Sequence, residues 1–403
     1  MFNRKTGNLS FRSTNATWIE ERSVYKYPDT KILLWEESTF ASGMDYWIST
    51  DGTEGFSHTT TIFKATTSEK PTDIFCYDQD GNLYILWKDS SDYKVRRFAL
   101  KEDGSYEKPG VDASLLTSND VSAIAVDISD AQNSLYYAYA NGSYGYIQKK
   151  SWNVGSAFST ASDVYGYEVP FNADDVAVTA LAANKDGVFV GVTETYKDGS
   201  IDKYRLKVQK YKKADGSLDS QITLEDAVSY TDVTTGNPIP APSLDLNHAP
   251  NTPCHQYQET INGLQIGNGK LYGISSKLHR KWILYSGSYR TDVFKHSSIL
   301  YTIGSTAEAL PSSPLAKEAR PVDDTNKVGY GFYRFIAVKY DEQERIKCII
   351  ASDSAWGDGV SSMNGGNSDR IVEFNLKDMV FGEDKESGGT FSKTLSSSGF
   401  FWN

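Results

Sequence analysis

One pattern recurs along the chain: an apolar strand, a turn built on Asp-Gly or Asn-Gly, and a second apolar strand. It is clearest over residues 74–87, where Asp80 and Gly81 separate two apolar runs, and it returns around residues 184–187 and 267–269. Glycine takes positive φ without a side-chain clash, and Asp or Asn tolerates it better than most residues. Such a dipeptide between apolar runs therefore predicts a β-hairpin.

Further strand patterns flank each hairpin, so the repeating unit has about four strands, which is the pattern of a β-propeller blade. Long helical periodicity does not occur, so the fold class is all-β. We expect a six-bladed β-propeller closed by an N-terminal strand over residues 14–20. If the Pro-rich residues 224–258 hide a further strand pair, the ring would be seven-bladed instead.

The 403 residues fit one such ring, so residues 1–403 are expected to form a single domain. Residues 224–258 are expected to form an inserted loop, because proline cannot donate a hydrogen bond to a sheet. The expected blades span residues 21–70, 72–118, 121–172, 175–223, 259–304 and 328–402.

The segment from Asp78 to Ile85, with the sequence Asp-Gln-Asp-Gly-Asn-Leu-Tyr-Ile, resembles the inner hairpin of NHL-type and related lactonase-like propeller blades. Residues 184–190 and 268–272 are similar to it. The resemblance implies a blade structure and carries no catalytic motif. Propellers serve as enzymes, lectins, scaffolds and adhesins, so the fold alone does not assign a function.

The formal net charge of −11 argues against nucleic acid as a partner, because such a protein needs a basic stripe. Lys and Arg are scattered, and their densest groups, at residues 149–150 and 207–213, fall on expected edge strands. Charged side chains on an edge strand commonly block unwanted strand pairing.

Composition also bears on location. No apolar run reaches transmembrane length, and residues 1–7 lack the apolar core of a signal peptide. The abundance of Ser, Thr, Tyr, Gly and Asn resembles that of bacterial surface and secreted β-proteins, so an extracytoplasmic location is expected. Three cysteines are too few for a disulfide framework; Cys76 and Cys348 are expected in buried strands, and Cys254 in a loop.

Two segments carry candidate sites. The first, residues 244–258, contains His248, His255 and Tyr257 as candidate ligand-binding residues. The two histidines are seven positions apart, a spacing that matches no standard metal-ligand pattern. The alternative is a surface loop whose polar groups satisfy its own backbone.

The second segment, residues 353–369, is rich in Asp, Asn and Gly, which can supply the oxygen ligands that Ca²⁺ prefers. It lacks the glutamate of an EF-hand, and the alternative is a long turn. Trp356 could stack on a sugar ring and is a further candidate ligand-binding residue. The candidate metal-ligating residues are Asp353, Asp358, Asn364 and Asp369.

Other motifs are missing or have a structural explanation. The chain has no Gly-x-Ser-x-Gly nucleophile elbow and no phosphate-binding Gly-Lys-Ser/Thr loop. The acidic turn from Asp78 to Gly81 is expected to be structural, because the equivalent turns of the other hairpins carry fewer carboxylates. We therefore expect a non-enzymatic recognition module that binds protein or glycan through loops on one face. The alternatives are a propeller enzyme acting on a sugar or lactone with a divalent cation in its channel, and a structural component of a bacterial or phage assembly.

Overall fold

The computed structural model describes the backbone of most of residues 69–319 and of separate strands on either side. The described residues are 31–36, 43–49, 56–64, 69–89, 92–101, 106–115, 120–129, 131–141, 144–169, 175–243, 250–267, 269–285, 288–319, 332–340, 346–353, 371–375, 380–381 and 395–401. Side chains are described only within residues 69–316. The expected closing strand, residues 14–20, lies outside this part of the chain.

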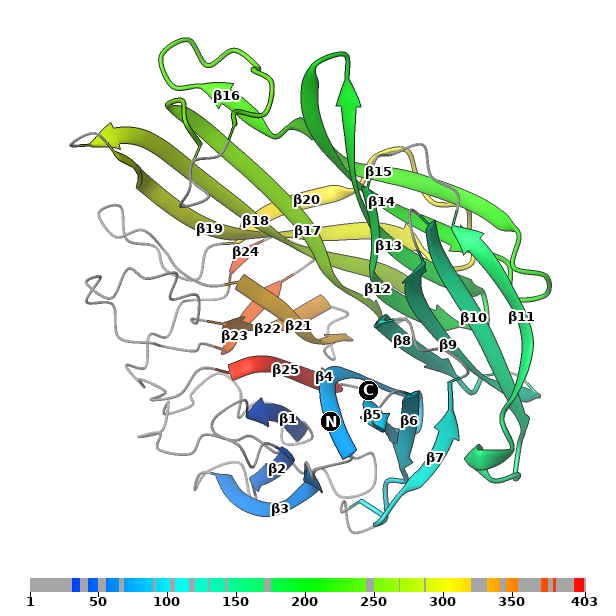
Figure 1. Cartoon of the computed structure of the whole chain (residues 1–403). Coiled ribbons are helices and arrows are strands. Elements are labelled where there is room, and N and C mark those ends of the chain that lie inside the picture. The colour runs from blue at the N-terminus through cyan, green and yellow to red at the C-terminus, as the bar shows by residue number, and fades with distance from the viewer. Residues whose placement is uncertain are drawn as a thin grey trace.

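The described strands form antiparallel sheets arranged as the blades of an all-β propeller (Figure 1). The four sheets with described side chains are β4 (Glu69–Tyr77), β5 (Leu83–Asp89), β6 (Asp92–Phe98) and β7 (Val111–Ser114); β8 (Val121–Asp127), β9 (Gln132–Asn141), β10 (Tyr144–Asn153) and β11 (Ser162–Val169); β12 (Asp175–Asn184), β13 (Gly187–Asp198), β14 (Ile201–Tyr211) and β15 (Leu218–Val228); and β16 (Tyr230–Asp232), β17 (Cys254–Gly267), β18 (Lys270–Tyr285), β19 (Ser288–Ser305) and β20 (Leu315–Ala319).

Two further sheets are described by their backbone. Their strands are β21 (Phe332–Tyr340), β22 (Ile346–Asp353), β23 (Ile371–Asn375) and β24 (Val380–Phe381) in one, and β25 (Leu395–Phe401), β1 (Lys31–Glu36), β2 (Gly43–Ser49) and β3 (Phe56–Lys64) in the other. One short 3-10 helix, η2 (Phe158–Thr160), packs on β7. The all-β propeller predicted from the hairpin pattern is confirmed.

Hydrophobic residues from facing blades fill the spaces between them. Tyr84 and Leu86 of β5 pack with Ile124, Val126 and Tyr137 of the next blade. Further along the ring, Leu206 and Val208 of β14 pack with Ile261 of β17 and Tyr301 of β19. These side chains are almost completely buried, and burial of apolar area of this kind is the main force that holds neighbouring blades together.

The prediction of an inserted loop over residues 224–258 needs correction at both of its ends. β15 continues to Val228, β16 occupies Tyr230–Asp232, and β17 begins at Cys254. Thr231 pairs with His255, so β16 extends the sheet beside the innermost strand β17. The prolines that broke the sequence pattern lie between these strands, at residues 238–253, which is why the strands beside them were hidden.

The blade formed by β16–β20 is longer than its neighbours. β18 has 16 residues and β19 has 18, whereas β13 and β14 of the adjacent blade have 12 and 11. The outer strand β20 pairs only with Ser298–Thr302 of β19, so the rest of β17–β19 continues past it, toward the upper left of Figure 1. We call residues 254–259 of β17 and 277–297 of β18 and β19 the extension.

Candidate functional site

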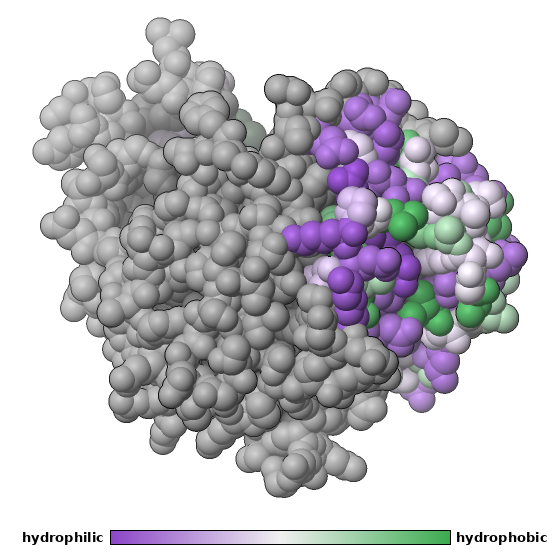
Figure 2. All heavy atoms as spheres, turned by 90° about the horizontal axis from the view of Figure 1, so that it is seen from below, coloured by the Kyte–Doolittle hydropathy of each residue, from purple (hydrophilic) through white to green (hydrophobic). Residues whose placement is uncertain are grey.

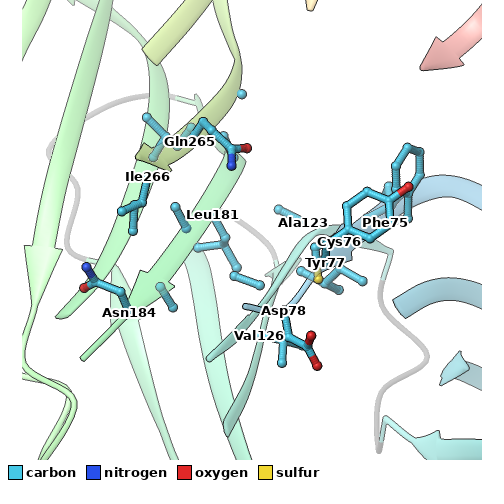
Figure 3. A pocket seen from close by; sticks show the side chains of 18 of the residues that line it. Phe75, Cys76, Tyr77, Asp78, Ala123, Val126, Leu181, Asn184, Gln265 and Ile266 are labelled. Atoms are coloured by element: carbon cyan, nitrogen blue, oxygen red, sulfur yellow. The ribbon is translucent and has the colours of Figure 1, made fainter. Parts of the chain in front are cut away.

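The innermost strands of four blades surround a cavity of about 690 Å³. Its described walls are residues 74–79 of the first blade, 122–126 of the second, 179–185 of the third and 260–266 of the fourth. Figure 3 shows Leu181 and Gln265 across the cavity from Phe75 and Cys76. A volume of this size lies within the range of small-molecule sites.

A β-bulge occurs in each of three neighbouring inner strands that line the cavity. The register shifts between Val121 and Ala123, between Val178 and Ala180, and between Ile261 and Gly263. The extra residues are polar, and all three line the cavity: Ser122, Thr179 and Asn262. The extra residue of a bulge is left out of strand pairing. These three positions therefore add polar groups to a cavity wall that is otherwise mostly apolar. Thr179 Oγ1 is buried there without a hydrogen-bond partner in the described part of the chain.

The acidic turn at one end of the cavity is structural, as predicted. Asp78 Oδ1 accepts hydrogen bonds from the backbone N–H groups of Asp80 at 3.0 Å and Asn82 at 2.9 Å. Its Oδ2 accepts from the Asn82 amide at 2.8 Å and from the Tyr84 hydroxyl at 2.9 Å. Gly81 has a φ of 79°, the conformation that the Asp-Gly signal predicts. Burial raises the pKa of Asp78 even though these donors oppose the shift.

The extension carries a cluster of rings at the opposite end of the inner strand β17. His255 Nδ1 and His279 Nε2 lie 3.0 Å apart, so one imidazole donates a hydrogen bond to the other. The Tyr257 ring stacks on the His279 ring, with centroids 4.6 Å apart and an interplanar angle of 13°. All three side chains are half-buried. We call these residues, His255, Tyr257 and His279, the ring cluster.

Strand register explains why the three rings meet. Tyr257 stands directly opposite His279, and His255 stands opposite Lys281. Directly opposed residues of an antiparallel pair lie on the same face of the sheet, so all four share one face. Burial, followed by the positive charge of Lys281, lowers the pKa of His255. The neutral imidazole is therefore favoured near pH 7.

A buried carboxylate lies next to the ring cluster on the same face. The Glu259 side chain is buried, and its Oε1 accepts hydrogen bonds from the Ser275 hydroxyl and from the Tyr301 hydroxyl at 3.3 Å. Its Oε2 lies 3.7 Å from Lys277 Nζ and accepts no hydrogen bond within the described residues. Burial outweighs these partners and raises the pKa of Glu259. Burial and then the charge of Glu259 raise the pKa of Tyr204 on β14 of the neighbouring blade.

The structure brings two of the sequence-predicted candidates together and leaves the others undescribed. His255 and Tyr257 belong to the ring cluster, on a strand and not on the predicted loop. His248, Trp356, Asp358, Asn364 and Asp369 lie outside the described residues. Asp353 is the last residue of β22, and only its backbone is described.

Sequence reasoning missed His279, the partner of both other rings. The signal that could have found it is the run from Lys277 to Lys281, in which four of five residues are Lys, Arg or His. The expectation that Cys254 lies in a loop also needs correction. It is the first residue of β17 and is buried, and burial raises the pKa of its thiol to about 11. A thiol held protonated in this way is a poor nucleophile.

No group of three or more His, Cys, Asp or Glu side chains among the described residues is placed to hold a metal ion. Within the same residues, no helix has the length and apolar character needed to cross a membrane.

No family model and no curated protein matches the sequence. Among solved structures, the chain is similar to a prolyl endopeptidase (11% identity, TM-score 0.34), covering 88% of this chain and 48% of that one. It is also similar to an α-L-arabinanase of Penicillium chrysogenum (10%, TM-score 0.33, 76% and 88% covered) and a β-fructofuranosidase of Bombyx mori (8%, TM-score 0.34, 92% and 85% covered). The chain spans about half the length of the prolyl endopeptidase. At these scores the similarities carry no argument about what this chain does.

Proposed function

We propose that the protein is a non-enzymatic recognition module that binds a protein or glycan ligand on the extension of the β16–β20 blade. The ring cluster carries this proposal. Two imidazoles and a phenol ring are held together on adjacent strands, half-buried, beyond the outer strand of their blade. Rigid rings with a polar end suit a binding surface because they offer a large contact area and lose little conformational freedom on binding.

The rigidity of the surrounding strands supports the proposal further. β17 and β18 pair continuously from Cys254 opposite Trp282 to Gly267 opposite Lys270, apart from the bulge at Asn262. On the other face, Gln256 accepts a hydrogen bond from Trp282 Nε1 at 3.0 Å. A site built on paired strands holds its side chains in place more firmly than one on a loop.

Substitutions in the ring cluster test the proposal. Wild-type protein and the Tyr257→Ala and His255→Ala variants would be screened against a glycan array and a panel of cell-surface proteins. We expect at least one ligand to bind the wild type and to bind Tyr257→Ala at least about tenfold more weakly, the loss of one central aromatic contact. Val154→Ser, at an exposed turn of another blade, should bind like the wild type. A ligand that binds all four proteins equally would contradict the proposal.

The cavity favours a second candidate function. Its volume of about 690 Å³ would hold a sugar or lactone, so we also propose, as the alternative, a propeller enzyme with a divalent cation in the channel. Metal analysis by mass spectrometry and melting with and without chelator test this alternative. Stoichiometric Ca²⁺ whose removal lowers the melting temperature would favour the enzyme. A metal-free protein whose melting temperature does not change with chelator would leave the recognition module.

We propose that the ring has six blades. The described strands form six sheets, which supports the count. Contacts of β25 with both β4 and β21, together with its pairing to β1, support closure through the C-terminal strand. An experimental map of the ring tests this, and a seventh sheet would overturn it. An extracytoplasmic location remains part of the same proposal, supported by composition, and fractionation of the source cells tests it.

A further inference from the structure

The extension differs in charge from the rest of the protein. Residues 277–297 contain five Lys or Arg residues and a single acidic residue, Asp292, so this hairpin carries a formal charge of +4 in a chain of −11. Two histidines, His279 and His296, lie in the same segment. A local positive field on an otherwise acidic protein attracts anions to that place. The five basic residues are Lys277, Arg280, Lys281, Arg290 and Lys295.

The strand register places two of the basic residues opposite members of the ring cluster. Lys281 is the cross-strand partner of His255, and Lys295 of β19 is the cross-strand partner of His279. Glu259, a carboxylate on the same face, is buried at the base of the extension next to Lys277. It therefore presents little negative charge to a ligand that lies across the rings.

The basic residues and the ring cluster together indicate the chemistry of a ligand. Lys and Arg side chains pair with carboxylate or sulfate groups through charge-assisted hydrogen bonds. The partly exposed faces of Tyr257 and of the histidine rings can contact the apolar C–H face of a sugar ring, whose hydrogens carry partial positive charge. A sugar polymer with regularly spaced acidic groups offers both kinds of contact along one line.

The side of the protein seen in Figure 2 gives a comparison. Its described part is mostly hydrophilic, with small hydrophobic groups dispersed among polar ones. On the extension, basic residues and the ring cluster occur together on the adjacent strands β17 and β18.

Resting on the proposed function, we infer that the extension binds an acidic glycan, a polysaccharide that carries carboxylate or sulfate groups, with the ring cluster contacting the sugar and the neighbouring lysines contacting its anionic groups. The inference adds the chemical class of the ligand to the recognition role.

The experiment compares matched polymers on the full chain by calorimetry. Dextran sulfate and dextran share a backbone and differ in charge, and polygalacturonate supplies carboxylates. Polyglutamate and single-stranded DNA are polyanions that are not polysaccharides. We expect both acidic glycans to bind. Binding should weaken at least tenfold between about 0.1 M salt, where the Debye length is about 10 Å, and about 1 M, where it is about 3 Å.

Paired substitutions locate the site. Lys281→Gln with Lys295→Gln should weaken binding of the acidic glycans at least tenfold. Lys212→Gln with Lys270→Gln removes the same charge from exposed positions outside the extension and should leave binding unchanged. Melting temperatures of both double variants establish that they fold. If the double variant Lys281→Gln with Lys295→Gln does not fold, Lys281→Arg with Lys295→Arg serves as the second test. It keeps both charges and should retain binding.

Each other outcome overturns the inference in a distinct way. Equal binding of dextran and dextran sulfate would leave a recognition module for neutral glycans. Equal affinity for polyglutamate would indicate an acidic protein partner, and equal affinity for DNA a non-specific polyanion site. If no polymer binds, the acidic-glycan inference fails by itself, because the Tyr257→Ala screen with protein ligands still tests the recognition role separately.

Discussion

Gln79 of one blade joins Asp127 of the next through hydrogen bonds at both ends of its amide. Gln79 Nε2 donates to Asp127 Oδ1 at 3.1 Å, and Gln79 Oε1 accepts from the backbone N–H of Ile128 at 3.0 Å. Asp127 also pairs with Lys213 in the blade beyond. One carboxylate therefore links three consecutive blades, at the end of the inner strands where their hairpin turns lie.

Replacing Gln79 by alanine should lower the free energy of unfolding by about 1–3 kcal/mol, because it leaves a partly buried backbone donor and part of a buried carboxylate without their partner. Urea unfolding monitored by tryptophan fluorescence measures the change. Gln132→Ala, at an exposed position of β9, is the matched control and should stay within about 0.5 kcal/mol of the wild type. Equal effects of the two substitutions would show that the hydrogen bonds of Gln79 to the next blade contribute nothing to stability.

Asp78→Ala should destabilise the protein by at least about 2 kcal/mol, because the side chain accepts four hydrogen bonds in a buried turn. Asp80→Asn changes the neighbouring exposed carboxylate and keeps the turn preference of the residue, so it should have little effect. Thermal unfolding of both variants checks this prediction. A similar loss from the two variants would mean that the turn depends on acidic charge and not on the Asp78 hydrogen bonds.

Leu206→Ala should destabilise the protein by about 2–5 kcal/mol, since Leu206 is completely buried between the β12–β15 and β16–β20 blades. Leu218→Ala in the same blade removes an equal number of atoms from a side chain that is 41% exposed. It should cost much less. Chemical denaturation distinguishes them, and equal costs would mean that the space between these blades is not a packed core.

The stability of the protein should depend on pH through Glu259. Its pKa in the folded protein is raised above the usual value of 4.5. A carboxyl group with a raised folded pKa contributes stability that is fully present below about pH 4.5 and is lost as pH rises through the folded value. The Glu259→Gln variant keeps a neutral side chain of the same shape and should lack this loss.

Melting temperatures of wild type and Glu259→Gln at pH 5 and pH 8 test that prediction. The wild type should lose more stability than the variant between the two values, so that the variant gains relative to the wild type at pH 8. A difference between the two proteins that is the same at both pH values would show that Glu259 does not change its protonation state over this range.

The propeller could be predicted from the sequence because its signals are local. Asp80 and Gly81 specify one hairpin turn by their own conformational preferences, and the apolar runs beside them specify the strands. The turn at residues 184–187 is tighter, because Asn184 pairs directly with Gly187, but Asn184 Oδ1 accepts from the backbone N–H of Asp186 just as Asp78 Oδ1 accepts from that of Asp80. Local preference and the final fold agree at these positions, as expected of a sequence that folds to one structure.

The ring cluster could be predicted only in part, because it depends on strand register. Nothing in the local sequence pairs Tyr257 with His279, 22 positions apart, before β17 and β18 are known to be a hairpin in that register. The prolines before Cys254 made this segment resemble a loop. Long strands that run beyond a blade are also set by contacts with other strands and not by their own pattern.

The polar bulges at Ser122, Thr179 and Asn262 have a consequence for how this chain can change. These three residues line the cavity, while the residues on either side keep the pairing with the second strand of each blade. A substitution at one of these three positions therefore alters what the channel presents to a guest molecule without altering the register of any sheet. The wall of the channel can acquire a new chemical character while the ring that carries it stays the same.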